Sequence, residues 1–501
     1  MFITAWEIMG FASFLLIGTW HVEKKARTGA VKAFLQTRVG DIGLYIGVFL
    51  VIHQYGSLEI PFEGEEELSL FASLCLLFAV IGKSAQVPLQ SWLSAAMAGP
   101  TPVSALLHSA TLVGAGVLLL IRIFPLLPET ALFYIAVLGS ASILLTGLTA
   151  IFTSDIKKML AASTSSQFGF MLLAVGLGFP GAALGHWLAH AFMKSSLFLG
   201  AGVFQHAYKG TKYEKLKGSG KKFTYVFITF AIAGISLAGI PPMIGYYSKD
   251  GILASSFSSS EITYIIIALT GAFFTGIYIA KALNELWNGN AEEKTVHKKL
   301  WLLVGVTALV ALVLGGGFIL EKLIKITGYE FPKEKISKIL GISVAVIGLI
   351  IGWFFRNSWF PRSISDWIQK NYKMAGGYRQ LIAIPVLKIA GWTYSFDKVL
   401  LDFVLGIGNT GFKVAGWTYS FDRILLGFVQ GIGNTSIKIS GINGSFDHHL
   451  LEGVINIGKG IKQAGGAGRK WQSGLVHKEL AITIGILLVL LLILTASIFT
   501  I

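Results

Sequence analysis

Several ionisable side chains of this sequence lie inside long apolar segments, where a charge is costly unless a partner or water compensates it. Lys83 follows SLCLLFAVIG, and Lys249 follows IPPMIGYYS. Glu7 lies in ITAWEIMG, and His108 lies in PVSALLHSATLVGAG. Amines, imidazoles and carboxylates bind and release protons, so these positions predict a route for protons through an apolar environment.

His186, His190 and Lys194 follow one another at intervals of four residues. Successive positions rotate by about 40° around a helix, so the three side chains share one face and suit a proton relay. Two alternatives stay open. The histidines could join neighbouring helices by hydrogen bonds. The HxxxH spacing could also bind a metal, but Trp187 stands where zinc proteases carry glutamate and no third ligand is evident, so we predict no metal site.

Prolines close to both lysines predict breaks in the helices that carry them. Pro88 follows Lys83, and the Pro241-Pro242 pair precedes Lys249. A buried amine needs a nearby carboxylate, and we predict that Glu7 pairs with Lys83. Lys249 could instead lie at a helix end and extend to the interface. The run STSSQ at 163–167 could line a hydrated entrance or join helices.

The composition places these groups in a membrane protein. Of 501 residues, 54% are hydrophobic and only 13% are charged, against about 25% in soluble domains. Mean hydropathy is +0.69. The single Cys75 excludes an internal disulfide or an iron–sulfur site held by cysteines of this chain. The net charge of +15 comes largely from lysines in short loops, as cytoplasmic retention predicts, and we expect no nucleic-acid binding.

About twelve apolar runs are long enough to cross a bilayer. They are 1–18, 39–55, 68–98, 101–124, 131–152, 156–178, 182–207, 223–248, 262–284, 300–320, 337–355 and 480–500. Basic loops follow the first, fifth, seventh and ninth runs, and the acidic SLEIPFEGEEEL follows the second. This alternation predicts that the basic loops are cytoplasmic, although the basic segment 321–338 does not fit. A cleaved signal peptide is not expected, because the first 18 residues lack a basic start.

Residues 357–478 contain no apolar run that could cross a bilayer, and they carry a repeat of about 25 residues. GWTYSFDKVLLDFVLGIGNTGFKVA (391–415) is followed by GWTYSFDRILLGFVQGIGNTSIKIS (416–440) and by a weaker copy that begins GINGSFDHHLLEGV. Phe396, Leu400 and Phe403 recur at helical spacing, which predicts an amphipathic helix on a lipid or protein surface. A packed soluble cap is the alternative. The run 480–500 predicts a C-terminal anchor helix.

Four segments together resemble the antiporter-like membrane subunits of respiratory complex I, in particular the subunit L family, which is similar to subunits of multi-subunit sodium/proton antiporters. The most specific is GKSAQVPLQSWLSAAMAGPTPVSALLHSATLVGAGVLLLIR at 82–122. The others are SDIKKMLAASTSSQFGFM at 154–171, HWLAHAFMKSSLFLGAG at 186–202 and IPPMIGYYSKDGIL at 240–253. The resemblance extends over about residues 1–356, and SFDKVLL resembles the family's long lateral helix.

The resemblance implies roles for the ionisable residues. Glu7 and Lys83 match an interacting pair; His108, His186, His190 and Lys194 match a central relay; Lys249 matches the lysine near the exit. It also implies an all-α bundle with inverted five-helix repeats, in which the spans 68–98 and 223–248 are discontinuous. The chain begins where the family has its fifth helix, so we expect a split gene, a fragment, or another chain that supplies the first four helices. The repeats after residue 357 are not typical of the family.

The function implied is proton translocation within a complex I-type NADH:quinone oxidoreductase, a translocase in which this subunit carries no redox centre. NADH or another donor, FMN, iron–sulfur clusters and quinone would bind other subunits. A subunit of a cation/proton antiporter or of an ion-coupled carbon-uptake complex is the alternative, although neither needs a lateral helix. The expected parts are an antiporter-like domain (1–356), a lateral segment (357–478) on the cytoplasmic side and an anchor (479–501), all in a bacterial inner membrane.

Overall fold

The computed structural model describes residues 2–56, 66–259, 261–291, 300–356 and 391–402, together with the single residues 359, 388 and 431. The chain divides into two compact units, Met1–Arg379 and Gln380–Ile501. The first unit holds the candidate site. Residues 391–402, at the start of the first repeat, are helical and exposed. The other repeats and the predicted anchor at 480–500 lie outside the described residues.

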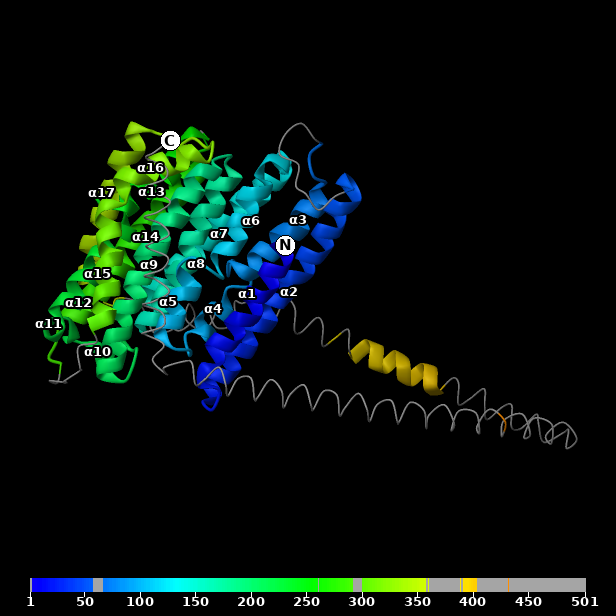
Figure 1. The fold of residues 1–501 in the computed structure, drawn as a ribbon, viewed down its shortest axis with the longest axis horizontal. Helices are drawn as coiled ribbons and strands as arrows, with labels where there is room; N and C mark the ends of the chain where they lie inside the picture. The colour runs from blue at the N-terminus through cyan, green and yellow to red at the C-terminus, as the bar shows by residue number, and fades with distance from the viewer. Residues whose placement is uncertain are drawn as a thin grey trace, which may run out of the picture. The chain divides into compact units, whose positions relative to one another are not determined.

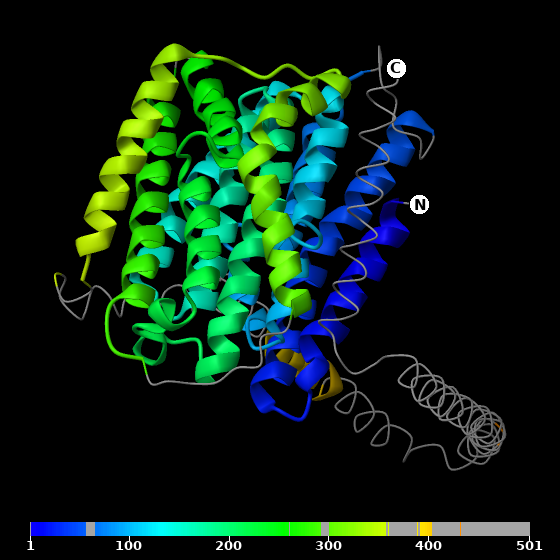
Figure 2. The same ribbon diagram turned by 60° about the vertical axis from the view of Figure 1, so that its left-hand side comes forward.

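The described part of the first unit is helical throughout, apart from one isolated bridge between Asp155 and Lys212. Its α-helices are α1 (Phe2–Ile17), α2 (Lys24–Tyr55), α3 (Leu70–Lys83), α4 (Ser91–Ala96), α5 (Thr101–Ser109), α6 (Gly114–Ile123), α7 (Glu129–Phe152), α8 (Ile156–Gly176), α9 (Pro180–Tyr208), α10 (Tyr213–Leu216), α11 (Ser219–Lys222), α12 (Thr224–Ala238), α13 (Ile244–Ser258), α14 (Ile262–Trp287), α15 (Leu300–Gly315), α16 (Gly317–Ile326) and α17 (Lys335–Phe354). The helices lie side by side in a bundle, as both views show (Figures 1 and 2).

The predicted fold class, an all-α bundle of membrane-spanning helices, is confirmed. Among the described residues, seven helices are long and apolar enough to cross a membrane, or up to nine when each bent pair is counted as one span. The second span differs from the prediction, because α2 begins at Lys24 rather than near residue 39. Residues 24–38 are rich in alanine, lysine and other good helix formers, so the helix extends through what the sequence indicated as a basic loop.

Both predicted discontinuous spans are present. The helix α3 ends at Lys83, and α4 begins only at Ser91, beyond Pro88. Likewise, α12 ends at Ala238, and α13 begins at Ile244 after the two prolines. Two further interruptions were not predicted. One separates α5 from α6 at residues 110–113, and the other bends α15 and α16 by 75°.

Close helix packing places α8 at the centre of the unit. A Cβ atom on Gly139 of α7 would lie 2.6 Å from the carbonyl oxygen of Gly169 on α8, so only glycine allows this approach. Along its apolar window α8 is 94% buried, whereas α1 is only 22% buried. The polar residues within this window of α8 are therefore largely enclosed, while α1 presents most of its surface outward.

Candidate functional site

Lys83 is the last residue of α3, and its side chain is completely buried. Its Nζ lies 3.4 Å from Oδ2 of Asp41 on α2, a carboxylate that is also completely buried. Trp6 of α1 donates a 2.7 Å hydrogen bond to Oδ1 of the same carboxylate. The indole ring of Trp6 also lies under the ammonium, 5.4 Å from Nζ. An ion pair at a helix break therefore joins the first three helices.

The predicted direct pair between Glu7 and Lys83 is wrong. Glu7 forms an ion pair with Arg38 and accepts a hydrogen bond of 2.5 Å from the Tyr45 hydroxyl. Arg38 in turn lies 3.8 Å from Asp41. Glu7 therefore belongs to the same polar cluster as Lys83. The carboxylate that pairs directly with Lys83, however, is that of Asp41 and not that of Glu7. Asp41 was not predicted as the partner because the predicted second span begins at residue 39. That boundary places Asp41 at the end of a span rather than inside one.

Room for the Lys83 ammonium comes from Gly10 on α1. A Cβ atom at this position would lie only 2.7 Å from Nζ. The absence of a side chain lets α1 approach the ion pair closely and places the backbone of α1 beside the amine. The first cluster consists of Glu7, Arg38, Asp41 and Lys83. The close packing of α1, α2 and α3 thus brings these four side chains together.

The three residues of the predicted stripe on α9 are all completely buried. His186 lies 2.9 Å from Oε1 of Gln167 on α8 through Nε2, and 3.0 Å from the Ser248 hydroxyl on α13 through Nδ1. The Gln167 amide donates to the Tyr278 hydroxyl on α14 at 3.1 Å. His186 thus stands at the junction of four helices.

The other two residues of the stripe contact neighbouring helices in the same way. Lys194 donates to the Ser163 hydroxyl at 2.5 Å and to the Leu160 carbonyl oxygen at 3.0 Å. Nδ1 of His190 lies 2.8 Å from the Ser109 carbonyl oxygen, at the end of α5. The run 163–167 therefore joins α8 to the relay stripe, which is one of its two predicted roles.

His108 lies in the last turn of α5, beside the interruption before α6. The rings of Trp92 and Phe198 flank it, with centroids 6.1 and 6.0 Å from the imidazole. Both of its ring nitrogens, and Nε2 of His190, are buried without a hydrogen-bond partner among the described residues. Buried polar groups ordinarily have a partner, so these nitrogens are suited to bind water or a transferred proton.

Lys249 is buried on α13, with 2% of its surface exposed. Its Nζ donates a 3.0 Å hydrogen bond to the carbonyl oxygen of Leu237, just before α12 ends. The ring of Phe170 lies 5.2 Å from the ammonium. The side chain therefore extends toward the interior of the bundle, which excludes the alternative in which Lys249 reaches the membrane interface from a helix end.

Two further buried lysines were missed. Lys157, which the sequence placed in a cytoplasmic loop, donates to the Gly99 carbonyl oxygen at 2.9 Å. Lys281 on α14 donates to the Ile151 carbonyl oxygen at 2.6 Å, at the end of α7. A cation at the carboxyl end of a helix is favourable for the helix dipole. Asp41 and Arg38 of the first cluster were likewise not predicted from the sequence.

The seven predicted residues fall into separate groups rather than one unbroken chain of direct hydrogen bonds in the described part of the structure. The loop after Lys83 is fixed to α8, because Ser165 donates to the Ala85 carbonyl oxygen at 2.6 Å and Gln86 donates to the Ser165 carbonyl oxygen at 3.2 Å. A proton could pass between the groups only through water or by side-chain motion. Among the described residues, no cluster of three or more histidine, cysteine or acidic side chains could hold a metal.

Comparison with known proteins identifies the family. Residues 1–275 match the family described as NADH:quinone oxidoreductase/Mrp antiporter, transmembrane. NADH-quinone oxidoreductase subunit L of Pseudomonas aeruginosa is 41% identical over 305 residues, which are 58% of this chain and 49% of that protein. Subunit L of Campylobacter jejuni is 36% identical over 427 residues, which are 79% of this chain and 71% of that protein.

A solved structure agrees with the sequence comparisons. The chain resembles a chain of the Mrp complex from Dietzia sp. DQ12-45-1b with a TM-score of 0.66 and 25% identity, over 79% of this chain and 46% of that one. The chain spans about half the length of several relatives, the P. aeruginosa protein included. With a family match over more than half of its residues, the chain belongs to the NADH:quinone oxidoreductase/Mrp antiporter transmembrane family.

Proposed function

We propose that this chain is a proton-translocating membrane subunit of a complex I-type quinone oxidoreductase. The observation that carries the proposal is the buried Lys83–Asp41 pair at a helix break, together with the buried stripe of His186, His190 and Lys194. Ionisable groups enclosed in a membrane bundle are retained at a cost in stability, which favours a role in ion movement. The names of the relatives, NADH-quinone oxidoreductase subunit L, support this assembly.

Each group has a proposed role. Lys83 would change its protonation as its pairing with Asp41 forms and breaks, under the influence of Arg38 and Glu7. His108, His186, His190 and Lys194 would pass protons through the centre, with water between groups that do not touch. Lys249 would deliver protons to the exit. NADH or another donor, FMN, iron–sulfur clusters and quinone would bind other subunits, so this chain would convert redox energy without carrying a cofactor.

The outward face of α1 and α2 supports a partner subunit. Arg38 is the fifteenth residue of α2, roughly 21 Å along a helix of about 48 Å, so it lies well away from both ends of the helix. Its side chain is 30% exposed, beside the outward-facing Ile42 and Phe49. A guanidinium facing lipid there would cost several kcal/mol. We propose that helices of another membrane subunit cover this face.

A cation/proton antiporter is the second candidate, because the similar solved structure is an Mrp complex. Purification of the native complex, with mass spectrometry of its chains, distinguishes the two. We expect co-purifying redox subunits, and we expect NADH oxidation by quinone to acidify inverted membrane vesicles. Proton movement driven by a sodium gradient without any electron donor, from a complex that lacks redox subunits, would favour the antiporter instead.

We further propose a bacterial inner-membrane topology in which the lateral segment (357–478) is cytoplasmic and residues 479–501 form an anchor after the antiporter-like domain (1–356). The support is the alternation of basic and acidic loops. In a Cys75→Ala background, Asp402→Cys should react with a membrane-impermeant maleimide only in inverted vesicles, since Asp402 is exposed. Labelling in right-side-out vesicles alone would reverse the orientation and remove the case for a cytoplasmic lateral helix.

A further inference from the structure

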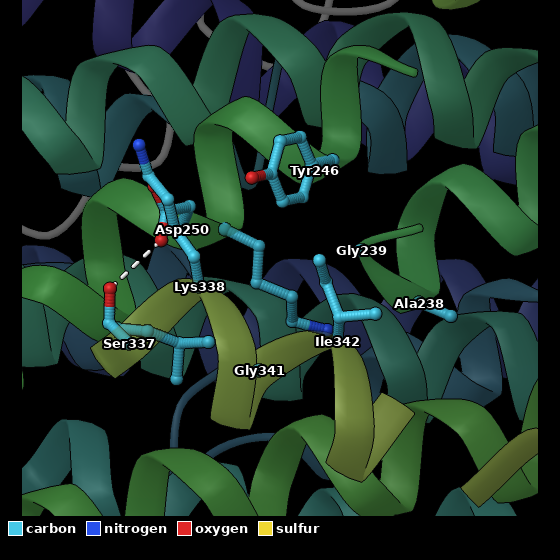
Figure 3. Close-up of a pocket in the computed structure, with 10 residues that line it drawn as sticks. Ala238, Gly239, Tyr246, Asp250, Ser337, Lys338, Gly341 and Ile342 are labelled. Atoms are coloured by element: carbon cyan, nitrogen blue, oxygen red, sulfur yellow. Dashed lines mark hydrogen bonds and ion pairs between the residues drawn. The ribbon is translucent and has the colours of Figure 1, made fainter. Parts of the chain in front are cut away.

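A narrow pocket lies where α12 ends and where α13 meets the first turns of α17 (Figure 3). Its volume of about 10 Å³ is close to what a single water molecule needs. Gly239 and Tyr246 line one side, and Ser337, Lys338 and Ile342 of α17 line the other. The residues of α17 lie beyond residues 1–275, over which the chain matches its family. The pocket is therefore lined in part by a helix, α17, that lies outside the region of the family match.

The Asp250 carboxylate lies between the interior and this opening. Its Oδ1 accepts a 2.9 Å hydrogen bond from Ser337, which Figure 3 shows as a dashed line. Its Oδ2 lies 3.9 Å from Nζ of Lys338. The Lys338 side chain is 41% exposed and that of Asp250 is 12% exposed, whereas Ser337 is buried. Two side chains of α17 thus fix a carboxylate that would otherwise be free to turn.

Lys249 reaches the same pocket from the inner side. Its side chain lines the pocket, and a Cβ atom on Gly239 would lie 3.2 Å from its Cδ. Its Nζ, however, is held at the Leu237 carbonyl oxygen. Consecutive residues of a helix do not face each other, so Lys249 and Asp250 point in different directions. Proton transfer between them therefore requires the Lys249 side chain to rotate away from the Leu237 carbonyl oxygen toward Asp250.

The mouth of the pocket lies near one end of the bundle. Ser337 and Lys338 are the third and fourth residues of α17, within roughly 5 Å of its start. Asp250 lies in the middle of α13 but at the level of this first turn of α17. A proton that leaves Lys249 toward Asp250 therefore moves from the buried relay to the aqueous face.

We propose that Ser337 and Lys338 are positioning residues that hold Asp250 as the acceptor for the Lys249 proton at an outlet to water. In the step, an N–H bond of the Lys249 ammonium breaks, an O–H bond forms on the Asp250 carboxylate, and the proton then passes to water. Lys338 balances the carboxylate charge and keeps Asp250 from pairing permanently with Lys249. This inference rests on the proposed function, because it assumes that Lys249 carries protons.

Accessibility of the pocket is tested first, without any assay of pumping. In a Cys75→Ala background, Ile342→Cys should be labelled by a membrane-impermeant methanethiosulfonate from the outer side, since it faces the outlet. Ile347→Cys is the matched control. It lies roughly 18 Å along α17 from its start, with 50% exposure on the apolar outer surface, so it should stay unlabelled. An unreactive Ile342→Cys would overturn the outlet.

The positioning role is tested on the complete complex in proteoliposomes. Lys338→Met should lower the protons moved per electron severalfold in a complex that still assembles, Ser337→Ala should do so less, and Lys338→Arg should restore the ratio. Lys335→Met, which removes an exposed lysine one turn away, should have no effect. If the wild type moves protons and Lys338→Met moves as many protons per electron as the wild type, only this inference is overturned. A wild type that moves no protons would overturn the proposed function, while the Ile342→Cys labelling would still report on the pocket.

Discussion

Asp41→Asn should lower the free energy of unfolding by about 3–5 kcal/mol, the usual effect of removing one member of a buried ion pair. Both side chains of the Lys83–Asp41 pair are fully buried, so the ammonium left behind has neither a countercharge nor bulk water. Asparagine keeps the size of the side chain and can still accept a hydrogen bond from Trp6. The loss therefore reports on charge rather than on packing. Reversible unfolding in mixed micelles measures it.

Glu7→Gln is the matched control for this prediction. Glu7 pairs with Arg38 rather than with Lys83, so its neutralisation should leave the contribution of Lys83 to the free energy of unfolding nearly unchanged. In a double-mutant cycle with Lys83→Met, we expect an interaction free energy above about 1 kcal/mol for Asp41 and below about 0.5 kcal/mol for Glu7. The opposite order would mean that Lys83 responds to Glu7 and that the contact with Asp41 is incidental.

Lys194→Met should lower proton translocation by roughly 100-fold or more, as the loss of a positioned proton-transfer group commonly does. Methionine is apolar and of similar length, so it fills the same space without a titratable group. The variant also removes the hydrogen bonds to Ser163 and Leu160, but the buried packing of α9 is retained. Acidification of proteoliposomes that contain the complete complex measures the effect.

Lys158→Met provides the control for Lys194→Met. Lys158 lies near the start of α8 and is only half-buried, so its neutralisation should leave the rate of acidification within about twofold of wild type, the effect of a surface change. Ser163→Ala should give a smaller defect than Lys194→Met, because the lysine keeps its bond to the Leu160 carbonyl oxygen. Wild-type acidification by Lys194→Met would remove the central relay from the mechanism.

Proline and helical spacing made part of the site predictable from the sequence. Pro88 and the Pro241-Pro242 pair indicated where the two discontinuous spans break, since proline cannot donate the backbone hydrogen bond that continues a helix. The four-residue spacing of His186, His190 and Lys194 likewise predicted one shared face. Both inferences depend on the geometry of a single helix, which the local sequence determines.

Contacts between helices were not predictable in the same way. Asp41 and Lys83 are 42 residues apart, and their meeting depends on how α2 and α3 pack. Because residues 24–38 were assigned to a loop, Asp41 seemed to lie at the end of a span rather than in the middle of a long helix. Lys157 and Lys281 were missed for a related reason, since their burial depends on carbonyl oxygens at the ends of other segments.

The ratio of protons moved to electrons transferred by the complete complex in proteoliposomes, with Lys83→Met compared with wild type, tests the central claim most directly. The claim is that the buried ionisable groups of this chain carry protons across the membrane. The account predicts that the variant assembles with its partner subunits but moves fewer protons per electron, since methionine cannot titrate at the break between α3 and α4. A wild-type ratio in an assembled Lys83→Met complex would contradict it.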